Sequence, residues 1–252
     1  MDRVSSELVD RACRRWATKG AEAAAERRLE PTKPHGFTIA VSREAGTPGS
    51  VVAAEVGKLL GWQVYDQELL HQIADEMGLR ESLLESVDER QQSWLRESIQ
   101  ASLAALASGS ASPWASVSSF VHHLVETVLA LGVHGECVIV GRGAGFILPK
   151  ESTLRVRLVS PIHDRIVALS RKLDITERQA AHRVRTIDRQ RNDFVRDHFQ
   201  KDPTDPQYFD LILNTSRLSV DDAAHLVIET LNRVKVRLAA GTAPADEIVH
   251  AR

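Results

Sequence analysis

The sequence has few cysteines and no basic excess. Only two cysteines, Cys13 and Cys137, occur in 252 residues, and they stand in no metal-ligand spacing. We therefore expect neither a disulfide framework nor a cysteine-based metal centre. The formal net charge is −2, whereas general binders of nucleic acids or membrane surfaces carry a marked basic excess. We expect neither kind of partner.

The sequence also lacks a long uninterrupted hydrophobic run. Its most apolar long window, residues 120–133, contains His122, His123 and Glu126, which predicts a buried helix rather than a membrane span. The first 16 residues have no apolar core of the signal-peptide type. The ten histidines show no metal-ligand spacing. Together with the scarce cysteines, these features predict a cytoplasmic protein in a reducing compartment.

What the sequence does contain is an alternation of strands and helices. Residues 4–29 predict an N-terminal helix, and the prolines and glycine of 30–36 predict a linker after it. Short apolar, β-rich runs then predict strands over residues 37–42, 62–66, 136–141, 154–160 and 208–215. Helical patterns fill the gaps, over residues 50–60, 67–78, 80–134 (broken near 108–114), 161–173, 176–200 and 219–238. Strands separated by such helices predict an α/β fold with a parallel sheet covered on both faces.

Ligands of such sheets bind beyond the carboxyl ends of the strands, and the first strand is followed there by the loop "SREAGTPGS". The standard phosphate loop reads G-x-x-x-x-G-K-[ST]. At that spacing Arg43 replaces the first glycine, Pro48 the second and Gly49 the lysine, while Ser50 keeps the hydroxyl. A helix N-terminus attracts anions through its free N–H groups, although a proline removes one donor. The alternative is a strand-to-helix turn without a ligand.

Charged residues follow the other strands as well. Asp66 and Glu68 come after the second strand, where Asp66 is equally suited to cap the next helix. Arg142 follows the third strand. Between the last two strands, residues 165–201 hold ten Lys or Arg and five Asp or Glu, an excess of +5. Arginine binds phosphate oxygens bidentately, so this excess predicts a polyphosphate ligand.

Six segments in this order carry a family resemblance: "SREAGTPGS", "VYDQELL", "VIVGRGAGFIL", "LRVRLVSP", "DRQR" and "DPTDPQYFDLILNTSRLS". They resemble the cytidylate-kinase-like family, a branch of the P-loop nucleoside monophosphate kinases, from about Phe37 to about Val236. The family typically reads "SRE-x-GSGG" at the loop, so it too lacks the lysine, and Arg43 is the candidate to replace its charge. Cytidylate kinases proper have an aspartate after the arginine of the third strand, where this chain has Gly143.

The resemblance implies a three-layer fold with a five-stranded parallel sheet, and transfer of the γ-phosphoryl group of ATP, with Mg²⁺, to a nucleoside monophosphate. It implies a kinase-like domain over residues 36–240, between an extension (1–35) that is a candidate homodimer contact and a flexible tail (241–252). Within the domain it implies a helical acceptor-binding segment at 66–134 and a lid at 171–208.

The same resemblance implies the site residues. The loop would bind the ATP phosphates through Arg43, Ala45, Gly46, Thr47, Gly49 and Ser50, with Ser50 also a candidate Mg²⁺ ligand. The acceptor would lie against Asp66, Glu68 and Arg142. Arg185, Arg189 and Arg191 would clamp the transferring phosphoryl group, and Asp188 would orient an arginine or a metal-bound water. For any single arginine of the lid, a solvated helix face is the competing interpretation. A nucleotide sensor without turnover and a small-metabolite kinase remain alternative functions.

Overall fold

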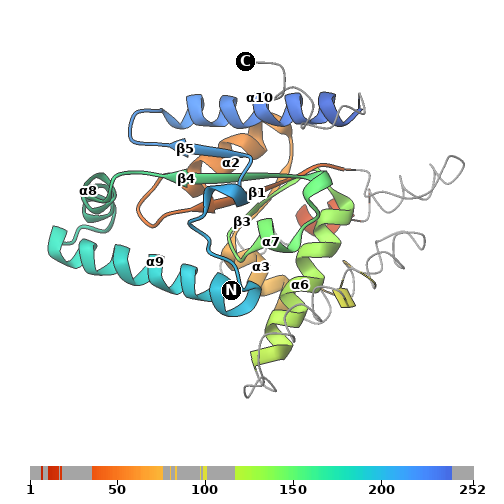
Figure 1. Ribbon diagram of the computed structural model, residues 1–252, viewed down its shortest axis with the longest axis horizontal. Helices are drawn as coiled ribbons and strands as arrows, with labels where there is room; N and C mark the ends of the chain where they lie inside the picture. The colour runs from red at the N-terminus through yellow and green to blue at the C-terminus, as the bar shows by residue number, and fades with distance from the viewer. Residues whose placement is uncertain are drawn as a thin grey trace, which may run out of the picture.

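The computed structural model describes residues 36–75 and 117–239, together with residues 7, 11–16, 18, 80, 83, 97, 99 and 100. All five predicted strands are present and form one parallel sheet in the order β2-β3-β1-β4-β5 (Figure 1). Their bounds are Thr38–Arg43 (β1), Gln63–Tyr65 (β2), Cys137–Val140 (β3), Thr153–Val159 (β4) and Leu211–Asn214 (β5). The predicted fold class is confirmed.

Helices cover both faces of this sheet. Their bounds are Gly49–Leu60 (α2), Gln67–Asp75 (α3), Val117–His134 (α6), Ala144–Ile147 (α7), Ile162–Leu173 (α8), Glu177–Phe199 (α9) and Val220–Ala239 (α10). Short 3-10 turns occupy Lys150–Ser152 (η1) and Pro206–Tyr208 (η2). In Figure 1, α2 and α10 lie above the sheet, α3, α6 and α7 lie below it, and α8 and α9 extend along the side on which the strands end. These are the three predicted layers.

Each face of the sheet has its own hydrophobic cluster. One cluster joins Val52, Val56 and Val227 of the α2 and α10 layer to the strands, and the other joins Leu70 and Leu124 of the α3 and α6 layer. The strands are buried on both faces, as their nearly continuous apolar composition requires.

Local signals in the sequence set several element ends. α2 stops at Gly61, which has φ 66° and ψ 24°, a left-handed conformation that glycine adopts without steric cost. α9 starts with a capping box in which Thr176 and Gln179 satisfy each other's backbone N–H groups. The fifth strand is shorter than predicted because Asp205 caps the η2 turn, accepting from Gln207 N at 3.0 Å.

The N-terminal helix is part of the domain rather than a solvated extension. Residues 11–16 are helical, and Ala12 and Trp16 are buried in the cluster below the sheet. Trp16 Nε1 donates to the hydroxyl of Tyr65 at 3.0 Å, and Arg15 donates to the carbonyl oxygens of Gly61 (3.0 Å) and Glu136 (2.8 Å). This part of the predicted extension therefore packs against the cluster below the sheet, with its charged residues flanking a buried aromatic one.

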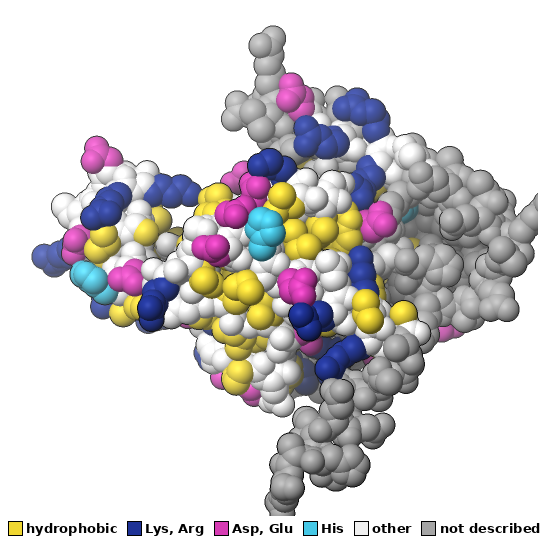
Figure 2. Space-filling view, turned by 90° about the horizontal axis from the view of Figure 1, so that it is seen from above, with side chains coloured by type: hydrophobic (Ala, Val, Ile, Leu, Met, Phe, Trp, Pro, Cys, Tyr) yellow, Lys and Arg dark blue, Asp and Glu magenta, His cyan; other side chains and the backbone are white. Residues whose placement is uncertain are grey.

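The predicted linker at 30–35, most of the helical stretch between 76 and 116 and the tail at 241–252 lie outside the described residues. Among the helices that are described, none is long and apolar enough to cross a membrane. The face over α10 mixes acidic and basic side chains with hydrophobic ones (Figure 2).

Candidate active site

The loop between β1 and α2 presents free backbone donors at a helix N-terminus. Pro48 is the N-cap residue, with φ −74° and ψ 23°, and its carbonyl accepts from the N–H groups of Val51 and Val52 at 2.9 Å. The backbone N–H groups of Gly46, Gly49 and Ser50 have no acceptor among the described residues. A loop with unpaired N–H groups ahead of a helix suits an anion.

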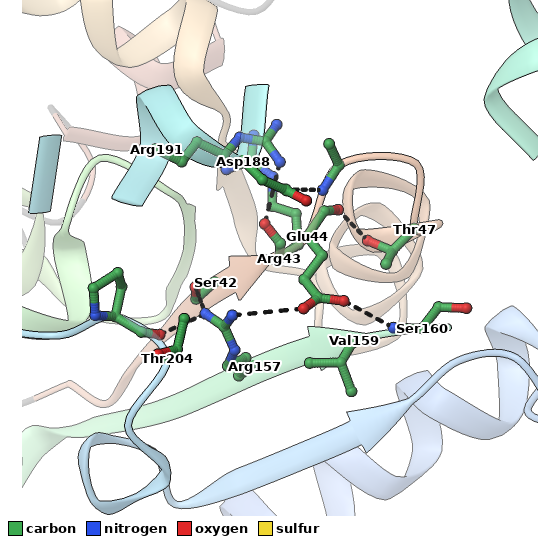
Figure 3. A network of polar contacts seen from close by, with 12 residues as sticks. Ser42, Arg43, Glu44, Thr47, Arg157, Val159, Ser160, Asp188, Arg191 and Thr204 are labelled. Atoms are coloured by element: carbon green, nitrogen blue, oxygen red, sulfur yellow. Dashed lines mark hydrogen bonds and ion pairs between the residues drawn. The ribbon is translucent and has the colours of Figure 1, made fainter. Parts of the chain in front are cut away.

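An alternating chain of charges holds this loop in place, and Figure 3 shows its contacts at Glu44, Arg157 and Asp188. Glu44 accepts from Ser160 N at 3.1 Å and lies 3.8 Å from Arg157 and 3.4 Å from Arg165. Arg165 also donates to Asp188 at 2.6 Å, and Asp188 in turn accepts from Ala45 N at 2.7 Å. The chain thus ties β4, α8 and α9 to the loop.

The same network fixes the two arginines that the sequence analysis did not select. Arg157 of β4 donates to the carbonyl of Pro203 at 2.6 Å and to Ser42 Oγ at 3.4 Å. Arg165 of α8 donates to the carbonyls of Ser160 (2.9 Å) and Ala45 (3.1 Å). A signal was present for Arg157, because two charged residues, Arg155 and Arg157, interrupt an apolar strand.

Three other arginines converge beyond the loop without a carboxylate partner within ion-pair distance among the described residues: Arg43, Arg142 and Arg191. Burial, together with the positive charges of Arg191 and Arg142, lowers the pKa of Arg43 to about 10, while the charge of Asp66 acts in the opposite direction. Burial, followed by the charge of Arg191, also lowers the pKa of Arg142. Burial lowers the pKa of Arg191, and the charge of Asp188 opposes this effect. Arg191 also donates to the backbone carbonyl of Arg43 at 3.1 Å. Three partly desolvated guanidinium groups gathered in this way favour an anionic ligand.

The backbone around Arg43 is shaped to admit its side chain. A Cβ on Gly49 would lie 2.7 Å from Cβ of Arg43. A Cβ on Gly141 would touch the Arg43 guanidinium group, with Cζ 3.3 Å away. The stem of Arg43 therefore runs past the position where a standard phosphate loop has its lysine, and its charged end lies at the start of the β3 loop.

These side chains line a cavity of about 370 Å³ between the ends of the strands and α9, a size that suits a small-molecule ligand. Five arginines but only two carboxylates line it, Arg43, Arg142, Arg155, Arg157 and Arg191 against Glu44 and Asp188. Both carboxylates are already paired in the network described above. The cavity is therefore built for an anionic ligand.

The structure places the predicted residues unequally around this cavity. Arg43, Arg142, Asp188 and Arg191 line it, whereas Arg185 and Arg189 are exposed and do not. The side chain of Arg142 is aimed by an unusual backbone, φ 54°, and its guanidinium lies 5.7 Å from the centre of the Phe194 ring.

Of the residues that follow β2, Gln67 lines the cavity, whereas Asp66 and Glu68 do not. Asp66 is exposed and caps α3, accepting from the N–H groups of Glu68 at 3.1 Å and Leu69 at 2.9 Å, while its charge acts on Arg43. Glu68 is exposed. In the loop, Thr47 donates its hydroxyl to the Glu44 carbonyl at 2.8 Å, and Ser50 is exposed on the first turn of α2.

Comparison with known proteins agrees with this geometry. A sequence profile of the cytidylate kinase-like family matches residues 38–217. The chain belongs to this family. The profile spans the loop, the five strands and α9, so the whole cavity lies within the matched region.

Among the individual relatives, a solved structure supports the fold, and none indicates an activity for this chain. The crystal structure of an uncharacterized protein from Eubacterium ventriosum is similar, with a TM-score of 0.61 and 18% sequence identity, over 78% of this chain and 98% of that one. A uronate isomerase of Corynebacterium glutamicum is 28% identical over 97 residues, which are 38% of this chain. This stretch spans only 19% of the isomerase.

Proposed function

We propose that this member of the cytidylate kinase-like family transfers the γ-phosphoryl group of ATP to the phosphate of a nucleoside monophosphate. The observation that carries the proposal is the convergence of Arg43, Arg142 and Arg191, without carboxylate partners, on a cavity beside a loop with free N–H groups. Phosphoryl transfer depends mainly on positioning and charge neutralisation, so it needs such donors more than an acid-base pair.

The loop residues fit the phosphates of the donor nucleotide. The N–H groups of Gly46, Gly49 and Ser50 are available donors, and the dipole of α2 adds to their effect. Among the described residues, no group of three or more His, Cys, Asp or Glu side chains is placed to hold a metal ion. Mg²⁺ commonly keeps several waters and binds substrate phosphates, so the Ser50 hydroxyl is the protein ligand that this site offers. Bound there, Mg²⁺ would neutralise charge on the phosphates.

The arginines divide between the two substrates. Arg142 and Arg191 would hold the acceptor phosphate, because both line the cavity beyond the loop. Arg43 would act between donor and acceptor, since its stem passes Gly49 and its guanidinium reaches Gly141. In this arrangement Arg43, at the end of β1, would supply the positive charge that the lysine supplies in the standard phosphate loop. A phosphorylated acceptor is favoured over a neutral hydroxyl of a small metabolite, because three guanidinium groups without a carboxylate partner among the described residues suit a dianion.

A nucleotide sensor without turnover is the second candidate. Two observations favour it: Pro48 has no N–H, and the Asp188 carboxylate occupies the N–H of Ala45. The exposed Arg185 and Arg189 keep their proposed role as phosphate clamps only if α9 moves toward the loop on binding.

A kinase assay with ATP, Mg²⁺ and a panel of nucleoside monophosphates separates these candidates. We expect a nucleoside diphosphate product from the wild type. Arg191→Met should lower kcat/KM for the acceptor at least ~100-fold, because charge-assisted contacts to the phosphate are lost. Arg183→Met, on an exposed residue of the same helix, is the matched control and should stay near the wild type. Nucleotide binding without any product would support the sensor.

A further inference from the structure

The position that follows Arg142 is closed to any side chain. Gly143 has φ 71° and begins α7, and a Cβ built on it would touch the Phe199 ring, with Cζ 2.9 Å away. Phe199 is the last residue of α9. The ring therefore closes the sequence position at which, according to the resemblance described above, cytidylate kinases proper have an aspartate.

Phe199 belongs to a cluster of rings beside the arginines, which we call the aromatic wall: Phe146, Phe194, Phe199 and Phe209. Phe199 stacks on Phe146 with centroids 6.2 Å apart and planes 18° apart, and it meets the edge of Phe194 at 6.0 Å. Phe146 meets the edge of Phe209 at 6.4 Å. All but Phe199 line the cavity directly. An aromatic surface of this kind suits a flat ring.

The wall is continuous with the arginines of the cavity. Arg142 lies over Phe194 and Arg157 lies over Phe209, the latter at 5.5 Å. A ligand whose phosphate meets the arginines can thus place a planar group against the wall. The cavity has the two parts that a nucleoside monophosphate requires.

Among the charged side chains that line the rest of the cavity, guanidinium donors outnumber carboxylate acceptors, and amide and hydroxyl side chains that can donate or accept complete the lining (Ser42, Gln67, Gln190, Asn192 and Thr204). Glu44 and Asp188 are its only carboxylates in the described part of the chain, and both are paired. Arg155 lines the cavity too, and its Nε is buried without a hydrogen bond, with Asp210 at 3.8 Å. A ring that presents carbonyl oxygens finds donors here, whereas a ring with an amino group finds no free carboxylate to receive it.

We propose that the acceptor is a pyrimidine monophosphate of the uridylate type, whose ring presents two carbonyl oxygens; this inference rests on the proposed function. Gly143 and Phe199 exclude recognition of cytidylate through its amino group. Gly143 and Phe199 together determine specificity. Gly143 leaves room for the phenyl ring of Phe199, and that phenyl ring occupies the space that a carboxylate side chain at position 143 would need. A buried donor left unpaired discriminates strongly between otherwise similar ligands.

Isothermal titration calorimetry with uridine monophosphate, cytidine monophosphate and inorganic phosphate tests this proposal. We expect uridine monophosphate to bind wild-type protein at least tenfold more tightly than cytidine monophosphate, and inorganic phosphate to bind more weakly than either. Equal or tighter binding of cytidine monophosphate overturns the proposal, and so does binding of inorganic phosphate alone.

Two variants sharpen the test. Phe199→Leu keeps an apolar side chain but removes the ring, and should weaken uridine monophosphate while leaving inorganic phosphate unchanged. Gly143→Asp combined with Phe199→Ala restores space and a carboxylate, and should shift the preference toward cytidine monophosphate. Unchanged preference in the double variant counts against the pair, with circular dichroism as the folding control.

The kinase assay separates failure of this proposal from failure of the proposed function. A preference for uridine monophosphate without phosphoryl transfer overturns the proposed function alone. Transfer to cytidine monophosphate in preference to uridine monophosphate overturns the specificity proposal alone. Binding of neither nucleotide overturns both.

Discussion

Two partly buried arginines of this site should have opposite effects on stability when each is replaced by methionine. Arg43 has neighbours of like charge and no hydrogen bond from its guanidinium to a described residue. Arg165 donates to Ser160 and Ala45 and is paired with Asp188. We expect Arg43→Met to raise the free energy of unfolding of the ligand-free protein and Arg165→Met to lower it.

The magnitudes follow from the surroundings of each group. Burial and repulsion lower the pKa of Arg43 to about 10, and since each pH unit is worth about 1.4 kcal/mol, the charge costs on the order of 3 kcal/mol in the folded protein. Partial exposure screens some of this, so we expect Arg43→Met to add about 1–2 kcal/mol. Removing Arg165 takes one ion-pair partner from Asp188 and one from Glu44, both partly buried, which costs about 3 kcal/mol.

The sign of the pH dependence provides a second check. A base whose folded-state pKa is lowered destabilises the protein at every pH below that value, and the effect fades as pH rises through it. The gain from Arg43→Met should therefore be constant from about pH 6 to about pH 9 and should shrink above about pH 10.

Urea unfolding followed by tryptophan fluorescence measures both variants against the wild type. The slope of the transition should stay the same, so that midpoints report stability. The prediction is wrong if Arg43→Met is less stable than the wild type, because Arg43 would then not destabilise the ligand-free fold. It is also wrong if Arg165→Met is as stable as the wild type, because Arg165 would then not stabilise it. Arg43→Met should also lose phosphoryl transfer. A gain in stability together with a loss of activity would indicate that Arg43 is kept for function at a cost in stability.

Two further predictions concern α9 and the N-terminal helix. Asp188→Asn removes the negative charge that competes for the N–H of Ala45, so ATP should bind several-fold more tightly in calorimetry; weaker binding would mean that the carboxylate supports the nucleotide instead. Trp16→Phe removes the buried donor to Tyr65 and should cost about 1–3 kcal/mol of unfolding free energy in urea. An unchanged urea midpoint would show that the N-terminal helix contributes nothing to the domain.

The sheet was predictable because its strands are short apolar runs between helices and need no knowledge of distant residues. Chain order also placed Arg142 correctly at the end of β3, and the loop at the end of β1. The charge network of Glu44, Arg157 and Arg165 was not predicted, because a charged residue in a helix or strand is usually exposed. Which carboxylate meets which guanidinium depends on tertiary packing.

In α9, the positions of the apolar residues would have improved the prediction of which charged residues face the cavity. The resemblance pointed to Arg185, Arg189 and Arg191, of which Arg185 and Arg189 are exposed. The buried residues Ala180, Val184 and Val195 define the inward face of α9. Counting turns from Val184 puts Asp188 and Arg191 on that face, where the structure has them. Hydrophobic residues, rather than charges, indicate which arginines of a helix reach a site.

The central claim is that this cavity brings an acceptor phosphate to the γ-phosphoryl group of ATP. Phosphorus NMR of the protein with ATP, Mg²⁺ and uridine monophosphate measures this directly. The account predicts the appearance of uridine diphosphate with the wild type and its near absence with Arg142→Met. ATP consumption without any nucleoside diphosphate from any monophosphate, or equal turnover by Arg142→Met, would contradict it.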